Sequence, residues 1–202
     1  MAARGFPALA RIPRLRSSMV TGERHIPAEG GYGLRRWQTG DAAVVLDAFS
    51  DAELAWQAGE RIGTAEDAGR WIAGWTHKQV GGVAYALAVL DPDGDVVGNV
   101  VLDAIDRYHG TARVTCWTVP RARGRGAATH AVRALARWAF GSFDLFRLEL
   151  SHRADNAASC VVADRAGFLV EGLQRSKLRR DDTRYDVEMH SRLRTDPVPV
   201  LD

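Results

Sequence analysis

The chain has 202 residues, of which 46% are apolar and 26% charged, and its formal net charge is +2. This composition is typical of a soluble globular protein and excludes collagen-like, low-complexity and wholly disordered chains. The near-neutral charge gives no reason to expect a nucleic-acid or membrane partner, and no apolar run approaches the ~18 residues of a membrane-spanning helix. At this length one domain with its own core is expected.

The two cysteines, Cys116 and Cys160, are too few for a disulfide framework or a four-ligand metal site. Neither has the CxxC or CxxH neighbours of a metal or redox motif. The sequence therefore implies no metal, and it favours a reducing, cytoplasmic setting.

The ends of the chain differ from its middle. Residues 1–20 carry four arginines and no acid, and they lack the apolar stretch of a secretory signal. We predict a disordered tail over residues 1–30, with Met19 as an alternative start, a domain over 31–194 and a second tail over 195–202. An organelle-targeting or RNA-contacting arm is the alternative for the first tail.

Hydrophobic periodicity predicts the elements in chain order. Period-two or continuous apolar runs predict strands at 33–37, 83–90, 96–102, 112–119, 146–151, 168–175 and 185–193. Helical spacing predicts helices at 42–49, 51–60, 64–75, 128–139 and 156–166. The second to fourth strands form an antiparallel meander, so we expect an α+β (mixed α/β) domain with one sheet of about seven strands flanked by helices.

The most informative segment joins the fourth predicted strand to the helix at 128–139. It contains Arg121, Arg123, Gly124, Arg125 and Gly126. Glycines allow the backbone to approach a ligand, and the first N–H groups of a helix attract an anion. The arginines would add charge-assisted hydrogen bonds, which together predict a phosphate or pyrophosphate site. A solvated turn is the alternative.

The residues after these glycines narrow the choice of ligand. Gly126 precedes Ala127 and Ala128 rather than Lys-Ser/Thr, so a nucleotide-triphosphate loop is excluded. A dinucleotide fingerprint would need glycine at Thr129 and a parallel strand before it. Coenzyme A remains as the phosphate ligand.

At this point the motifs resemble a known family. The pattern Arg121-x-x-Gly124-x-Gly126 resembles the pyrophosphate loop of the GNAT N-acetyltransferase superfamily. The later Asn156-x-x-Ser159, Ala166-Gly167-Phe168 and Glu171-Gly172 are similar to its ribosomal-protein N-terminal (alanine/serine) acetyltransferase branch. The resemblance runs from about Tyr32 to Leu193.

This resemblance implies acetyl-CoA as cosubstrate, no metal, and a twisted, mostly antiparallel sheet that splays where Val119 and Ser151 end. The implied cofactor-binding residues are Trp117, Thr118 and Val119 for the pantetheine arm, Arg121, Arg123, Gly124, Arg125, Gly126, Ala127 and Ala128 for the pyrophosphate, Asn156 for the pantetheine end, and Arg165 for the adenosine. The backbone N–H near Val119 would donate to the oxyanion. For Arg165 an ordinary solvated charge is the alternative.

Catalysis requires a proton donor for the departing thiolate. Many family members carry a tyrosine at the position of Ala163, and the nearest hydroxyl in the matching segment is Ser159. We therefore assign Ser159 to thiolate release, with a purely helix-capping role as the alternative.

The base that receives the amine proton is less defined by the sequence. Glu149 is the first candidate, and Ser151 and Asp103 lie at comparable strand ends. His152 and His190 are weaker candidates. A water relay without a dedicated base is a further alternative.

The sequence thus predicts an N-acetyltransferase that moves the acetyl group of acetyl-CoA to a primary amine, on a protein N-terminus or a small molecule, by direct attack in a ternary complex. A non-catalytic acyl-CoA- or RNA-binding regulatory module and a transferase for longer acyl chains are the alternatives. The basic connection at 175–184 would face an acidic or RNA-bearing acceptor, or form a solvated hairpin. Trp37 and Trp56 are candidates for an acceptor pocket, and a homodimer is left open.

Overall fold

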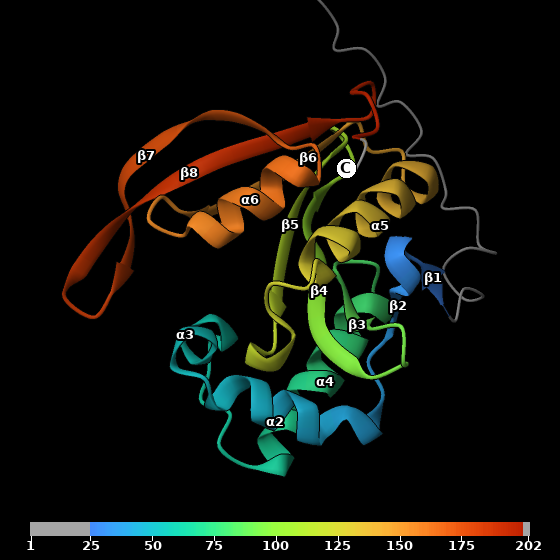
Figure 1. Cartoon of the computed structure of the whole chain (residues 1–202), viewed down its shortest axis with the longest axis vertical. Coiled ribbons are helices and arrows are strands. Elements are labelled where there is room, and N and C mark those ends of the chain that lie inside the picture. Colours follow the sequence, from blue (N-terminus) through green and yellow to red (C-terminus); the bar gives the residue numbers. More distant parts are fainter. Residues whose placement is uncertain (1–24, 200–202) are drawn as a thin grey trace, which may run out of the picture.

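The structure of the protein is a computed structural model that describes residues 25–199. Its eight strands form one sheet in the order β1-β2-β3-β4-β5-β6-β8-β7 (Figure 1). The strands are β1 (Ile26–Pro27), β2 (Gly33–Arg36), β3 (Tyr85–Leu90), β4 (Val96–Asp106), β5 (Thr111–Thr118), β6 (Arg147–Arg153), β7 (Leu169–Arg180) and β8 (Thr183–Leu193). The helices are α2 (Ala42–Ser50), α3 (Ala52–Ala55), α4 (Ala65–Val80), α5 (Ala127–Ser142) and α6 (Ala157–Arg165).

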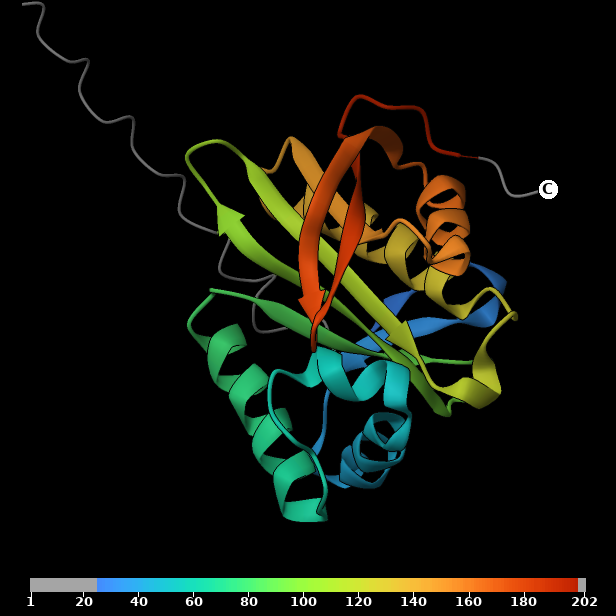
Figure 2. The ribbon, with the colours of Figure 1, turned by 90° about the vertical axis from the view of Figure 1, so that its left-hand side faces the viewer.

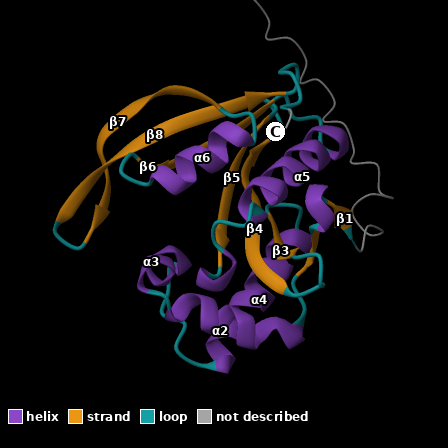
Figure 3. Ribbon diagram, in the orientation of Figure 1, coloured by secondary structure: helices purple, strands orange, loops and turns teal. Residues whose placement is uncertain are grey.

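Helices cover both faces of the sheet (Figure 3). Figure 2 shows α5 and α6 on one face and α2 and α4 on the other. On the α5 side, Tyr85 of β3 packs against Trp138 and Phe143. On the α2 and α4 side, Trp117 of β5 packs against Phe49 and Trp71. Because successive side chains of a strand point to opposite faces, the strands provide apolar side chains to the packing on both faces of the sheet.

Local signals explain where the helices begin. Thr64 caps α4, because its side chain accepts the N–H of Asp67 while the Asp67 carboxylate accepts the N–H of Thr64. Asp51 caps α3 in the same manner by accepting the N–H groups of Glu53 and Leu54. Helix α5 differs, because it follows Gly126 and has no side-chain cap.

The sheet is antiparallel except between β5 and β6. These two strands pair in parallel from Thr111 opposite Arg147 to Val114 opposite Leu150. Beyond that point β5 runs on to Thr118 and β6 to Arg153, but the two strands no longer pair with each other. The sheet therefore opens between them, and the expected splay is a feature of the fold.

The order and type of the predicted elements are confirmed, with one strand more than expected. The additional strand, β1, pairs Ile26 with Leu34 and is too short to produce a periodic pattern. Ile26 and Pro27 thus join the sheet, and Glu29–Gly31 forms a 3-10 helix, although the sequence places residues 1–30 in a tail. Leu193 N–H donates to Asp196 in the predicted C-terminal tail. Residues 1–24 and 200–202, including Met19, lie outside the described residues.

Candidate active site

The junction of β5 and α5 forms a turn with two glycines. Gly124 and Gly126 have φ of 77° and 85°, a left-handed conformation that favours glycine. Gly126 is the N-cap residue of α5, and the first turn of the helix contains neither a capping side chain nor an acid. The N–H groups of Ala127 and Ala128 are therefore directed at the turn with the positive end of the helix dipole.

The three arginines of this turn differ in their partners. Arg121 forms an ion pair with Asp47 of α2 at 2.9 Å, and Arg123 pairs with Asp51 at 3.2 Å. Among the described residues, Arg125 has no ion-pair partner. Exposed pairs of this kind contribute little stability, so Arg121 and Arg123 can exchange their acids for a phosphate.

The open edge of β5 is defined by the direction of its backbone groups. Val119 N–H donates to Val97 O of β4 at 2.9 Å, so it is not available to an oxyanion. The N–H and C=O groups of successive residues point to opposite sides of a strand. Those of Trp117 therefore point toward β4, like those of Val119, and those of Thr118 point toward the opening. Thr118, rather than Val119, is the donor at this edge.

Helix α6 follows β6, the strand that borders the opening on the side opposite β5. Asn156 caps the helix, since its Oδ1 accepts the N–H of Ser159 at 3.0 Å. Ser159 is half-buried, and its Oγ has no hydrogen-bond partner among the described residues. Ala163, the position without a hydroxyl, is fully buried. The side chain of Arg165 is exposed at the end of the helix.

The predicted carboxylate bases are held by arginines. Glu149 Oε1 accepts from Arg147 Nε at 2.8 Å, and Asp103 is bound through both oxygens by Arg113. Glu149 lies opposite Arg113 of β5, in the pair that precedes the last one between these two strands. Ser151 is exposed on β6.

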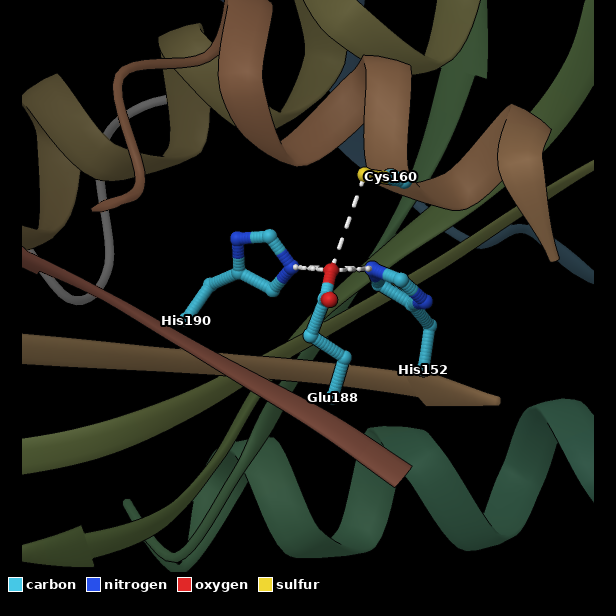
Figure 4. Close-up of side chains that lie close together, drawn as sticks. All are labelled: His152, Cys160, Glu188 and His190. Carbon is cyan, nitrogen blue, oxygen red and sulfur yellow. Dashed lines mark hydrogen bonds and ion pairs between the residues drawn. The ribbon is translucent and has the colours of Figure 1, made fainter. Parts of the chain in front are cut away.

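The structure also brings together four side chains that the sequence analysis did not connect. His152 of β6, Cys160 of α6, and Glu188 and His190 of β8 place their ligand atoms within 4.8 Å of one another (Figure 4). Partial burial and the neighbouring Glu188 raise the pKa of the Cys160 thiol. Two signals were available: the Glu188-x-His190 spacing puts both side chains on one face of a strand, and His152 lies on a neighbouring predicted strand.

A pocket of about 1070 Å³ lies beside the turn, lined by residues of α2 and α3 and by the segment 59–63. Asp47, the partner of Arg121, and Trp56 belong to its lining. Arg180, near the tip of the β7–β8 hairpin, pairs with Glu53 of α3 and approaches the ring of Trp56. Trp37 instead is buried and donates to Asn99, so it belongs to the core.

Comparisons with known proteins agree with this geometry. A family model described as an acetyltransferase (GNAT) domain matches residues 32–169. YdaF of Bacillus subtilis (strain 168), by its name a candidate ribosomal N-acetyltransferase, is 30% identical over 102 residues, which are 50% of this chain and 56% of that protein. The ribosomal-protein-serine acetyltransferase of Escherichia coli (strain K12) is 26% identical over 65% of this chain and 73% of its own length.

The fold is likewise shared with solved structures. The RimL ribosomal L7/L12 alpha-N-protein acetyltransferase in complex with coenzyme A has a TM-score of 0.74 at 21% identity, over 84% of this chain and 97% of that one. RimJ of Mycobacterium smegmatis in complex with CoA-disulfide has a TM-score of 0.72 at 22% identity, over 84% and 86%. Within residues 25–199, none of the helices is long and apolar enough to span a membrane.

Proposed function

Because the chain belongs to the GNAT acetyltransferase family, we propose that it transfers the acetyl group of acetyl-CoA to a primary amine, by direct attack in a ternary complex. The proposal rests chiefly on the uncapped N-terminus of α5, which lies next to the open edge of β5. A pyrophosphate is the dianionic group that this turn suits, and an extended arm is what an unpaired strand edge suits.

The cosubstrate would bind along the opening of the sheet. The N–H groups of Ala127 and Ala128 and the guanidinium of Arg125 would hold the pyrophosphate, with Gly124 and Gly126 giving room for it. Arg121 and Arg123 would turn from Asp47 and Asp51 toward the phosphates. The pantetheine arm would pair with the backbone carbonyl of Thr118, Asn156 would contact the pantetheine end, and Arg165 would contact the adenosine.

The transfer then needs an oxyanion donor, an acid and a base. The amine nitrogen attacks the thioester carbonyl, and the N–H of Thr118 would stabilise the negative charge on its oxygen. As the C–S bond breaks, Ser159 Oγ would donate a proton to the thiolate. Glu149 would receive the amine proton through water, since one of its carboxylate oxygens has no partner among the described residues.

The proposed acceptor is a protein N-terminus, in keeping with the names of the relatives. The pocket lined by Trp56 and bordered by Arg180 adjoins the turn through Asp47, so it would receive the segment that carries the amine. The expected setting is the cytoplasm. A small-molecule amine or a longer acyl chain would use the same chemistry.

Thiol release from acetyl-CoA in the presence of defined amines tests the function. We expect release with peptides that have a free N-terminus, and none with the same peptides after N-terminal blocking. Release with spermidine or an aminoglycoside alone would assign a small-molecule acceptor. CoA binding without thiol release from any amine would contradict the enzyme and favour a regulatory acyl-CoA-binding module.

A further inference from the structure

The four-residue cluster between the sheet and α6 contains two buried imidazole rings. His190 is 1% exposed and His152 is 9% exposed. Their Nε2 atoms lie 2.9 Å apart, and Glu188 Oε1 lies 2.9 Å from His190 Nε2. In Figure 4 both rings point at this carboxylate oxygen, with the sulfur of Cys160 above it.

The outer nitrogens of both rings have backbone carbonyls as neighbours. Nδ1 of His152 lies 2.8 Å from Arg153 O, and Nδ1 of His190 lies 3.4 Å from Phe168 O. A carbonyl oxygen only accepts, so a hydrogen on each Nδ1 would satisfy both carbonyls and leave an Nε2 lone pair of each ring facing the centre. In that tautomer two lone pairs and a carboxylate oxygen would face one another, and a positive charge between them would stabilise the arrangement.

The distances suit a metal ion as that charge. Glu188 Oε1 lies 3.6 Å from both His152 Nε2 and Cys160 Sγ. A point roughly 1.9 Å from the two Nε2 atoms and Oε1 lies inside their triangle, close to the ~2.0–2.1 Å bonds of zinc to nitrogen and oxygen. The 3.6 Å separation of oxygen and sulfur matches the edge of about 3.5 Å in a zinc tetrahedron with those ligands.

We propose that His152 Nε2, Cys160 Sγ, Glu188 Oε1 and His190 Nε2 bind one zinc ion in tetrahedral geometry. Binding releases the thiol proton of Cys160 to solvent, because the thiolate is the ligand. The carbonyl acceptors at both Nδ1 atoms are the outer-shell partners that metal-binding histidines ordinarily have. With four protein ligands the site would be closed and structural, so this ion would take no part in the acetyl transfer proposed above.

The position of the site gives the ion a structural task. It would join β6, α6 and β8 at the side of β6 that lies beyond its last pair with β5. Helix α6 carries Asn156 and Ser159, so the ion would hold their helix against the sheet. Only the Glu188-x-His190 pair is local in the sequence, because the four ligands come from three separate elements.

Metal content of the untagged protein tests the proposal. After growth with zinc and removal of loose metal by gel filtration, elemental analysis is expected to find one zinc per chain. Cys160→Ala should lose the ion, whereas Cys116→Ala, the matched change at the other cysteine, should retain it. Glu188→Gln should weaken zinc by more than the ~10–100-fold that loss of an outer-shell partner costs, as measured by chelator competition.

Two measurements on the wild-type protein, cobalt spectra and melting temperature, do not depend on the folding of a variant. In the wild-type protein, cobalt should give the visible bands of a tetrahedral site and a thiolate charge-transfer band, and a chelator should lower the melting temperature. Absence of zinc from the folded wild type, with no cobalt bands on titration, would contradict the proposal and assign a shared proton to the two rings instead.

Discussion

At the scale of single residues, the first turn of α6 separates capping from catalysis. The cap is made by Asn156, whose Oδ1 accepts the backbone N–H of Ser159. The Ser159 hydroxyl takes no part in that bond. Removing the hydroxyl therefore leaves the cap in place, and an effect on turnover would report on chemistry.

We predict that Ser159→Ala lowers kcat by about 10- to 1000-fold, because the thiolate loses its proton donor while water substitutes in part. The KM for acetyl-CoA should change little, since the hydroxyl acts once charge develops on sulfur. Steady-state kinetics and the melting temperature are to be measured on one preparation.

Asn156→Ala is the matched control, because it removes the cap and should cost about 0.5–2 kcal/mol of stability. A Ser159→Ala protein with full kcat and a lowered melting temperature would show that the hydroxyl has only a structural role.

Asp41 supplies a pH-dependent contribution to stability. Burial raises its pKa, but the Arg35 guanidinium and the N–H of Gln38 lower it more, so the net pKa lies below the ordinary 3.8. A carboxyl with a lowered folded-state pKa stabilises fully above its unfolded pKa and loses that contribution as the pH falls through its folded pKa.

We predict that Asp41→Asn lowers the free energy of unfolding by about 1–3 kcal/mol at neutral pH. The gap from the wild type should narrow below about pH 4, where the Asp41 carboxyl takes up a proton in the unfolded chain more readily than in the folded one. Urea unfolding at several pH values measures it. A gap that stays constant with pH would place the effect in packing rather than in charge.

At the scale of elements, periodic segments were predictable and short or long-range features were not. The apolar positions of α5 repeat at helical spacing, so its type followed directly from the pattern. β1 has two residues, which no periodicity can reveal. The engagement of Val119 N–H with Val97 depends on how β4 and β5 pair, and the four-residue cluster depends on β6, α6 and β8 meeting.

The segment before β2 holds α5 through one carboxylate. Glu29 pairs with Arg133 at 2.9 Å and Arg137 at 3.0 Å, and Arg133 is 4% exposed. We predict that Glu29→Gln lowers the free energy of unfolding by about 1–2 kcal/mol, because the buried guanidinium of Arg133 loses its acid. The effect is no larger because the side chain of Glu29 is partly exposed to solvent. Glu66→Gln, at an exposed pair with Arg70, is the control and should change stability by less than about 0.5 kcal/mol. Equal effects at both positions would contradict this.

Residues 1–18 lie outside the described residues, so only the sequence bears on them. We predict that deleting them leaves CoA affinity, melting temperature and turnover unchanged, because they contain no periodic apolar face and no acid to pair their four arginines. A loss in any of the three quantities on the truncated chain would show that this arm contacts the domain or its acceptor.

At the scale of the whole molecule, the opening between β5 and β6 sets what the fold can bind. One half of the sheet carries the turn before α5, and the other carries β6, β8 and the helix α6 (Figure 1). A ligand with a phosphate group at one end and an extended arm can contact both halves at once. The proposed function thus depends on CoA lying in this opening.

Calorimetric titration of CoA into two glycine variants tests that claim most directly. Gly124 and Gly94 both have positive φ, and a Cβ at either would meet no atom within 4 Å, so alanine strains both backbones alike. Only Gly124 lies in the turn before α5, whereas Gly94 lies in the β3–β4 hairpin. We predict one CoA per chain for the wild type and Gly94→Ala, and markedly weaker binding for Gly124→Ala. No binding to the wild type at millimolar CoA, or equal affinities for the two variants, would contradict a CoA site in this opening.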